Sequence, residues 1–346
     1  MNSAYPEVSV VIPVFNEEEY IRGLMDSLLK QDYDMSMLEI ILVDGVSTDK
    51  TAEIIEEYQQ IHSVFKLLQN PKQTVQHALN IGMKAAQGKY IVRMDAHSEY
   101  ADNYISKCVE YLNKTDAVNV GGPMIAEGKT PVQKAIAAAY HSKFALGGGK
   151  NHDEAYEGYA DTVYLGAFKK ETLEEVGYYD KDLIRNEDDD LNFRLKEKGY
   201  KIYITPEIKS TYYPRCTYRE LFKQYFEYGE WKVAVRKKHG EHARLSHYIP
   251  FLFVLGLAAG GIASILSPFI FNESCSWVIP CAYGVGCGLY LLIDIIASFS
   301  NKRACGFIQK LRLVWIHIIL HISYGCGYIK GIFRDWNFSE KDNGAD

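Results

Sequence analysis

Several features that would mark other classes of protein are scarce or missing. Seven cysteines are scattered over 346 residues, an odd number without a C-x-x-C pair. Neither a disulfide framework nor a zinc site is indicated, and a reducing compartment is favoured. The formal net charge of -6 gives no reason to expect nucleic acid as a partner, because phosphate binders carry a basic surplus on their folded face. With 47% hydrophobic and 24% charged residues, the chain is globular rather than disordered.

Long uncharged apolar runs are absent before about residue 248, and the polar start Met1–Glu7 has no signal-peptide pattern. Instead, β-branched runs alternate with segments of helical periodicity. Strands are expected at Glu7–Phe15, Leu38–Val43, Val64–Gln69 and Tyr90–Met94, and helices after Asn16 and at Thr51–Tyr58, Val75–Ala86 and Asn103–Asn113. This alternation predicts an α/β domain over residues 1–240, with a mostly parallel sheet covered by helices on both faces.

The remaining residues, 241–346, are expected to form a membrane domain. Ile249–Phe271 and Trp277–Phe299 are long enough to span as a hairpin, and only Asp294 interrupts the second run. Leu313–Phe333 is either a third span or a helix lying in the interface or against other helices. Basic residues flank the hairpin on its outer sides, at Arg236, Lys237, Lys238, Arg244, Lys302, Arg303, Lys310 and Arg312. The prediction is a multi-pass protein of the cell membrane with its large domain on the cytoplasmic face.

Two phosphate-binding motifs are also absent. No G-x-G-x-x-G follows the first strand, and there is no G-x-x-x-x-G-K-[ST], so dinucleotide and P-loop chemistry lose support. Acidic or amide side chains end the predicted strands instead, at Asn16 and Glu17, at Asp44, and at Asp95 with His97. Ligands of open α/β sheets bind beyond these ends.

Asp95 and His97 follow a buried strand at a spacing that lets both ligate one divalent cation, such as Mg²⁺ or Mn²⁺ holding a diphosphate. The alternative is that Asp95 caps the following turn and His97 is a surface residue. Asp44 is a candidate ligand, whereas Asp49 fits an ordinary helix cap equally well.

A run of acids, Glu187-Asp188-Asp189-Asp190, precedes an apolar helical pattern. Acids at a helix N-terminus are favoured by the helix dipole, which explains some of them. A carboxylate crowded by other acids also acquires a raised pKa and can serve as a general base. Asp188 and Glu187 are the catalytic candidates, and spacing alone does not choose between them.

With these motifs in view, the chain resembles the family 2 glycosyltransferases of the GT-A nucleotide-diphospho-sugar transferase fold, closest to the branch of the succinoglycan-biosynthesis glucosyltransferase. The resemblance covers roughly residues 7–240. Its pieces occur in family order as VVIPVFNEEEYI from Val10, VDGVSTDKT from Val43, Asp95-Ala96-His97, DTVYLGAFKKETLEEVGYYD from Asp161, and NEDDDLNFRL from Asn186.

The resemblance implies a role for each matched residue. Pro13, Asn16 and Glu17 would border the nucleotide, and Asp44 would read the uracil or ribose. Asp95 and His97 would hold the metal. Asp188 would activate the acceptor hydroxyl, with Glu187 beside it.

Two departures from the family pattern bear on the interpretation. His97 stands where a second aspartate is usual, and this ligand change favours Mn²⁺ over Mg²⁺. The Q-x-x-R-W motif of processive synthases is not intact in the stretch Gln224–Lys232, which favours addition of a single sugar. Trp231 and Lys232 are expected near the diphosphate or the acceptor; alternatively, this stretch docks on the membrane.

The resulting hypothesis is an inverting transferase that moves a sugar, glucose by resemblance, from a UDP-sugar to a hydroxyl of a lipid-linked polyprenyl saccharide. Membrane lipids surround its hairpin. The nearest alternative is a polyprenyl-phosphate sugar synthase, whose acceptor is the lipid phosphate itself. A catalytically silent nucleotide-binding membrane scaffold is the third reading.

Overall fold

The computed structural model describes residues 7–240, 245–272, 274–336 and 338, and their contacts divide them into two compact units. The first unit contains residues 7–125 and 150–212, and the second contains 126–149 and 213–336. Arg244, one of the expected basic flanking residues, lies outside the described residues.

The first unit is built on an eight-stranded sheet with the strand order β3-β2-β1-β4-β9-β6-β10-β8. Its strands are β1 (Val8–Val14), β2 (Leu38–Asp44), β3 (Phe65–Gln69), β4 (Tyr90–Arg93), β6 (Ala117–Gly122), β8 (Gly158–Ala160), β9 (Tyr164–Lys169) and β10 (Lys201–Ile204). β3, β2, β1 and β4 pair in parallel, as does β10 with β6, whereas β9 and β8 run against their neighbours. The sheet is therefore mixed but mostly parallel, as predicted. β5 (Ser98–Tyr100), β11 (Ser210–Tyr212) and β7 (Ile125–Ala126) form a second sheet in the order β5-β11-β7, in which β5 and β11 are antiparallel.

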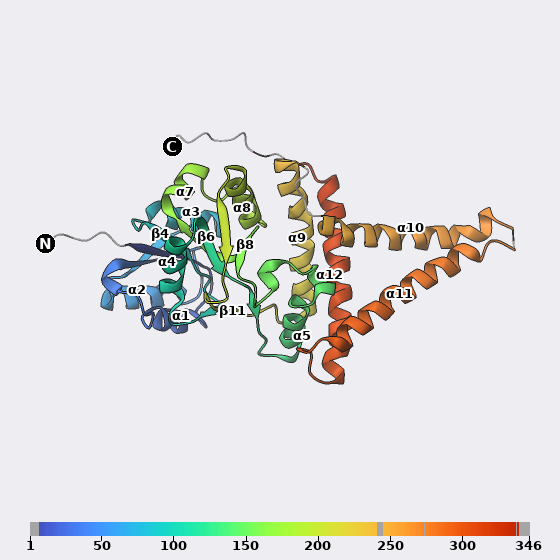
Figure 1. Cartoon of the computed structure of the whole chain (residues 1–346), viewed down its shortest axis with the longest axis horizontal. Coiled ribbons are helices and arrows are strands. Elements are labelled where there is room, and N and C mark those ends of the chain that lie inside the picture. Colours follow the sequence, from blue (N-terminus) through green and yellow to red (C-terminus); the bar gives the residue numbers. More distant parts are fainter. Residues whose placement is uncertain (1–6, 241–244, 273, 337, 339–346) are drawn as a thin grey trace. The chain divides into compact units, whose positions relative to one another are not determined.

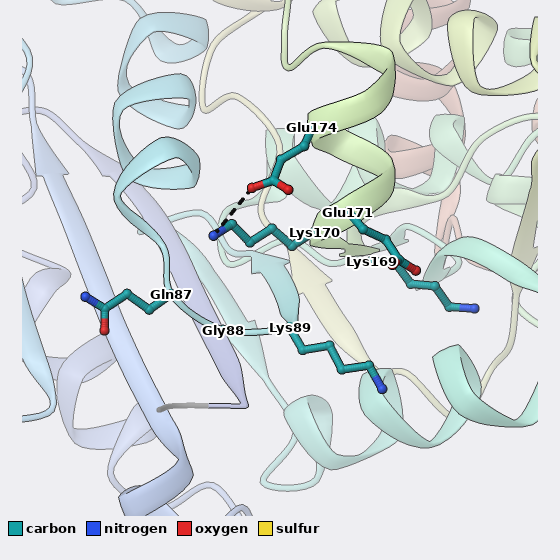
Figure 2. Close-up of a pocket in the computed structure, with 7 residues that line it drawn as sticks. All are labelled: Gln87, Gly88, Lys89, Lys169, Lys170, Glu171 and Glu174. Carbon is teal, nitrogen blue, oxygen red and sulfur yellow. Dashed lines mark ion pairs between the residues drawn. The ribbon is translucent and has the colours of Figure 1, made fainter. Parts of the chain in front are cut away.

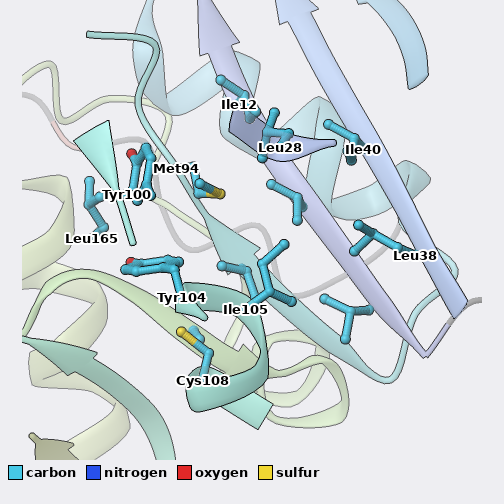
Figure 3. Packing of buried hydrophobic residues seen from close by; sticks show 14 of the residues in the cluster. Ile12, Leu28, Leu38, Ile40, Met94, Tyr100, Tyr104, Ile105, Cys108 and Leu165 are labelled. Carbon is cyan, nitrogen blue, oxygen red and sulfur yellow. The ribbon is translucent and has the colours of Figure 1, made fainter. Parts of the chain in front are cut away.

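Helices cover both faces of this sheet. They are α1 (Ile21–Leu28), α2 (Thr51–Ile61), α3 (Val75–Ala85), α4 (Tyr104–Lys114), α7 (Lys170–Val176) and α8 (Glu187–Glu197). Alternate residues of β1 serve the two faces: Val10 and Ile12 pack with residues of α1, α2 and α4, a core seen in Figure 3. Val11 packs with residues of α3, α7 and α8 on the other side. A strand buried on both faces explains why β1 reads as a continuous β-branched run.

The second unit is helical. It contains α5 (Pro131–Tyr140), α6 (Lys143–Leu146), α9 (Tyr218–His239), α10 (Ile249–Ile270), α11 (Val278–Ser300) and α12 (Phe307–Phe333). Figure 1 shows α9 and α12 side by side, with α10 and α11 leaving them as a hairpin. Of the described helices, α10 and α11 are long and apolar enough to be candidate membrane spans.

Helix α12, which contains the third hydrophobic segment, is not among these candidates. Its buried side chains pack against α9, and its His317 Nδ1 lies 2.6 Å from Asp294 Oδ1 of α11, with both side chains fully buried. One face of α12 therefore lies against other helices, and whether the helix spans a membrane stays a prediction.

The unit boundary differs from the one expected after residue 240, because α9 belongs with the later helices. Buried Glu230 of α9 pairs with Lys330 and Arg334, at 2.9 and 2.6 Å. Glycines at 229, 327 and 331 let the two backbones approach so closely that an added Cβ at Gly327 would lie 1.9 Å from the Phe226 carbonyl oxygen.

Candidate active site

The side chains predicted at strand ends come together at one edge of the sheet. β2, β1 and β4 are neighbours and run in parallel, so the loops after Val14, Asp44 and Arg93 leave the same edge. Pro13 lies in β1 beyond Val11, the last residue that pairs with β4. Its missing N–H therefore interrupts no bond to β4 in this buried strand.

The loops after β1 and β2 are fastened to each other. Asn16, whose φ is 54°, accepts at its Oδ1 a 2.8 Å hydrogen bond from Thr48 N and donates its own N–H to Ser47 Oγ at 2.9 Å. Glu17 N donates to Thr51 Oγ1 at 2.7 Å. The backbone N–H groups of both predicted residues and the Asn16 side chain thus fix the rim of the site.

Asp44 is 1% exposed and holds its own loop in shape. Its carboxylate accepts hydrogen bonds from Ser47 Oγ at 2.5 Å and from Ser47 N at 3.1 Å. This is the geometry of an aspartate that closes a turn on its own backbone. Contact of Asp44 with a nucleobase or ribose stays a prediction.

The Asp95-Ala96-His97 turn begins two residues after the end of β4 and is fixed by Tyr100. The Tyr100 hydroxyl accepts from Asp95 N at 2.6 Å and donates to Asp95 O at 3.1 Å. His97 is exposed, and its Nδ1 lies 3.5 Å from Glu17 Oε1, so an acid from the loop after β1 lies beside this imidazole. Among the described residues, no group of three or more His, Cys, Asp or Glu side chains has the arrangement of a complete metal site.

One atom of this turn is chemically unsatisfied. Asp95 Oδ1 is buried and makes no hydrogen bond, and the nearby Arg93 Nε lies at 3.5 Å. The Arg93 guanidinium thus supplies positive charge beside this oxygen, but the oxygen still lacks a hydrogen-bond donor and has room for a further ligand. Together with the imidazole of His97, it is a donor set that fits a divalent cation.

The acidic run forms the first turn of α8 after Asn186, whose φ is 59°. Asp190 is fully buried and pairs with Arg194 Nε at 2.9 Å. The same guanidinium donates to the carbonyls of Val176, Gly177 and Tyr178 at 2.6–2.7 Å. Asp190 therefore anchors α8 to the segment after α7.

Glu187 and Asp188 have different surroundings. Glu187 is 13% exposed at its side chain, and its Oε1 lies 3.5 Å from Arg93 Nη1. Asp188 keeps an exposed surface, yet the protein packed around it removes hydration and raises its pKa to about 7. The carboxylates of Asp189 and Glu187 contribute to this rise in pKa, and the Arg93 charge opposes it.

Trp231 and Lys232 lie on α9 in the second unit. Trp231 is 7% exposed, with its ring 4.9 Å from that of Trp336 and the same distance from the Arg334 guanidinium. Trp231 therefore serves packing within that unit. Its role near a diphosphate or acceptor, and that of Lys232, stay predictions.

A hollow of about 370 Å³ lies at the opposite end of β4 from these acids (Figure 2). Its lining includes Lys89, just before the strand begins, and Lys170, whose Nζ is 3.5 Å from Glu174 and donates to Ala86 O at 2.7 Å. Because it is remote from the carboxyl ends of the strands, this hollow does not define the site.

Sequence reasoning did not find Arg93 and Tyr100, which organise the turn around Asp95. The available signal for Arg93 was a basic residue inside the apolar run Tyr90–Met94. Tyr100 carried no signal, because its contact with Asp95 depends on how the turn folds back.

The mixed sheet with helices on both faces, and polar loops at its carboxyl edge, define the GT-A class of nucleotide-sugar transferase folds. A solved structure supports this: the mannosyltransferase PcManGT from Pyrobaculum calidifontis, in complex with GDP-Man and Mn²⁺, matches 95% of this chain and 88% of its own with a TM-score of 0.64 at 17% identity. The sequence profile of glycosyl transferase family 2 matches residues 9–176, and this chain belongs to that family.

Two relatives align over nearly their whole length. The succinoglycan biosynthesis protein ExoA of Rhizobium meliloti is 32% identical over 92% of this chain and 93% of its own. A Methanococcus voltae enzyme is 31% identical over 94% and 97%, respectively. It is the dolichyl N-acetyl-alpha-D-glucosaminyl phosphate 3-beta-D-2,3-diacetamido-2,3-dideoxy-beta-D-glucuronosyltransferase. The chain is therefore a glycosyltransferase of glycan biosynthesis.

Proposed function

We propose that this protein is a membrane-bound inverting glycosyltransferase that moves a single sugar from a UDP-sugar to a hydroxyl of a lipid-linked saccharide. The observation that carries this proposal is Asp188. It is an exposed carboxylate with a pKa raised to about 7, at the start of α8 and next to the Arg93–Glu187 contact. A base with a pKa near the working pH is suited to accept a proton in the transition state.

Geometry favours Asp188 over Glu187 as that base. The Glu187 carboxylate is largely buried and faces the Arg93 guanidinium, so an acceptor hydroxyl has little access to it. Asp188 has exposed surface that an acceptor hydroxyl can reach.

In the proposed reaction, Asp188 takes the proton from the acceptor hydroxyl while that oxygen attacks the anomeric carbon. The bond from that carbon to the diphosphate breaks, and UDP leaves with its electron pair. The transition state has oxocarbenium character, as in glycoside hydrolysis. One displacement inverts the configuration, so no second carboxylate is needed as a nucleophile.

Asp95 and His97 would hold a divalent cation, Mn²⁺ or Mg²⁺, which when bound supplies positive charge to the diphosphate. The unsatisfied Asp95 Oδ1 supports this assignment. Pro13, Asn16, Glu17 and Asp44 would border the nucleotide from the adjoining loops. A Mn²⁺ complex of the Pyrobaculum neighbour is consistent with such an ion.

A lipid-linked acceptor is supported by the two candidate spans and by the Methanococcus relative, whose name gives it a dolichyl sugar phosphate acceptor. The basic residues on the outer sides of the hairpin support a catalytic unit on the cytoplasmic face of the cell membrane. Membrane lipids would surround α10 and α11.

The test is nucleoside diphosphate release by the purified full-length protein. Donors are a panel of UDP-sugars and GDP-mannose, the acceptor is a lipid extract, and the reactions contain Mn²⁺, Mg²⁺ or EDTA. Asp188→Asn should lower transfer about 100-fold or more while leaving UDP binding nearly unchanged. Asp95→Ala should abolish metal-dependent release.

Asp116→Asn is the matched control, because Asp116 is an exposed acid paired with Lys201 and should keep normal transfer. Normal turnover in Asp188→Asn would overturn the base assignment and favour a lipid-phosphate acceptor, which has no hydroxyl to deprotonate. Absence of release with every donor would contradict the proposed function.

A further inference from the structure

Arg93 is a charged residue in an unusual place. It is the last residue of the central strand β4, it is 8% exposed, and the strand residues before it are buried. Burying a guanidinium is unfavourable unless anions surround it. The role of Arg93 is therefore to be sought in the acids that it faces.

Two segments supply those acids. Arg93 Nε lies 3.5 Å from Asp95 Oδ1 on the turn after β4, and Nη1 lies 3.5 Å from Glu187 Oε1 on α8. The guanidinium also lies over the Tyr179 ring, 5.6 Å from its centroid. Arg93 thus stands between the proposed metal ligand and the residue preceding the proposed base.

The contacts of Arg93 are unlike those of a guanidinium that fastens two elements. Arg194 shows that kind: it makes hydrogen bonds of 2.6–2.9 Å to Asp190 and three carbonyls. Arg93 reaches both acids only at 3.5 Å, and neither its Nε nor Asp95 Oδ1 makes a hydrogen bond. Its single positive charge offsets part of the negative charge of the two carboxylates and leaves Asp95 Oδ1 available to another cation.

We propose that Arg93 is a positioning residue for transfer, which holds Glu187, and through it Asp188, in register with Asp95. This inference rests on the proposed function. Without the guanidinium, Asp95, Glu187 and Asp188 would repel one another, and α8 would draw its base away from the donor. The charge lost beside Asp95 would at the same time make that carboxylate a stronger cation ligand.

The inference predicts that loss of the Arg93 charge lowers kcat without weakening UDP binding. In Arg93→Met, kcat should fall about 100-fold, as expected for misplacement of a catalytic group. Mn²⁺-dependent UDP binding, measured by calorimetry, should be unchanged or tighter. Arg93→Lys should retain part of the lost kcat. Arg22→Met is the matched control, since Arg22 forms an exposed ion pair with Glu57 and should keep normal kcat.

A variant that compensates for the lost Arg93 charge distinguishes a positioning role of Arg93 from a role in folding. Glu187→Gln introduced into Arg93→Met removes the repulsion and should raise kcat about tenfold over Arg93→Met alone, a non-additive result. A purely structural role predicts the reverse, with lower UDP affinity and melting temperature in Arg93→Met and a further loss in the double variant. That pattern, or normal kcat in Arg93→Met, would overturn the inference.

The two proposals fail separately in this experiment. If the unsubstituted protein turns over a donor and Arg93→Met behaves like it, only the role of Arg93 is wrong. If the unsubstituted protein turns over no donor, the proposed function and this inference are both overturned.

Discussion

At the scale of single residues, the adjacent acids of α8 have different surroundings and different roles. Asp190 is fully buried against Arg194, Glu187 faces Arg93, and Asp188 is exposed. Successive side chains of an α-helix point about 100° apart around the helix axis, so consecutive acids have different surroundings. The sequence identified the acidic run but did not predict which of its acids would have which role.

Asp188→Asn and Asp190→Asn should therefore have contrasting effects. Asp190→Asn breaks a buried ion pair and should lower the free energy of unfolding by about 3 kcal/mol. Asp188→Asn should leave the melting temperature unchanged or higher while removing transfer. Thermal unfolding and donor turnover of the two variants, measured side by side, check this; equal destabilisation by both substitutions would contradict it.

The pKa of Asp188 also predicts how the rate depends on pH. The proton-accepting carboxylate exists above its pKa, so transfer should fall as the pH drops through about 7. For stability the sign is opposite: a pKa raised above that of the unfolded chain favours folding at low pH, and this contribution is lost as the pH rises through about 7. A kcat profile between about pH 5 and pH 9 tests the first statement, with a flat profile as the contrary result.

Other residues show the limits of sequence reasoning at the site. The position of Asp44 at the end of a strand marks it as a candidate ligand, but it does not reveal that the carboxylate also closes its own loop on Ser47. Arg93 was passed over because the pattern of an apolar strand does not say which side chain at its end points towards another element. Both outcomes depend on side-chain direction, which spacing along the chain does not determine.

The positions of helices and strands could be predicted from the sequence better than the contacts between side chains. The four predicted strands and the helices between them lie close to their expected bounds, because a period of two or of 3.6 is written directly into the sequence. The reversed direction of β8 and β9 was not predictable, since a strand pattern carries no direction. The pairing of α9 with α12 was not predictable either, because the amphipathic pattern of α9 also fits a helix that lies on a membrane surface.

The approach of α9 to α12 provides a test at this scale. An added Cβ at Gly327 would lie 1.9 Å from the Phe226 carbonyl oxygen, so Gly327→Ala must push the helices apart. It should cost about 2 kcal/mol of unfolding free energy. Gly286→Ala in α11 is the matched control, since a Cβ there meets nothing within 4 Å. Thermal unfolding in detergent measures both, and equal melting temperatures would disprove the close contact.

For the whole molecule, average composition hides a division between a charged α/β part and an apolar hairpin. The fold class and the two candidate spans could be predicted, because each rests on local periodicity or hydropathy. Grouping residues 126–149 with the later helices could not, because it depends on contacts such as Asn301 Nδ2 to the Ala138 carbonyl, across more than a hundred residues.

Native cysteines can report how the protein is oriented in the membrane. Cys275 is exposed between α10 and α11, whereas the exposed Cys216 and Cys305 lie before α10 and after α11. If α10 and α11 span with both flanks cytoplasmic, a membrane-impermeant maleimide applied to intact spheroplasts should label a variant that keeps only Cys275. Variants that keep only Cys216 or Cys305 should react only after permeabilisation. Labelling of Cys216 in intact spheroplasts would place the preceding unit outside, where cytosolic UDP-sugars are absent, and would contradict both the orientation and the proposed donor.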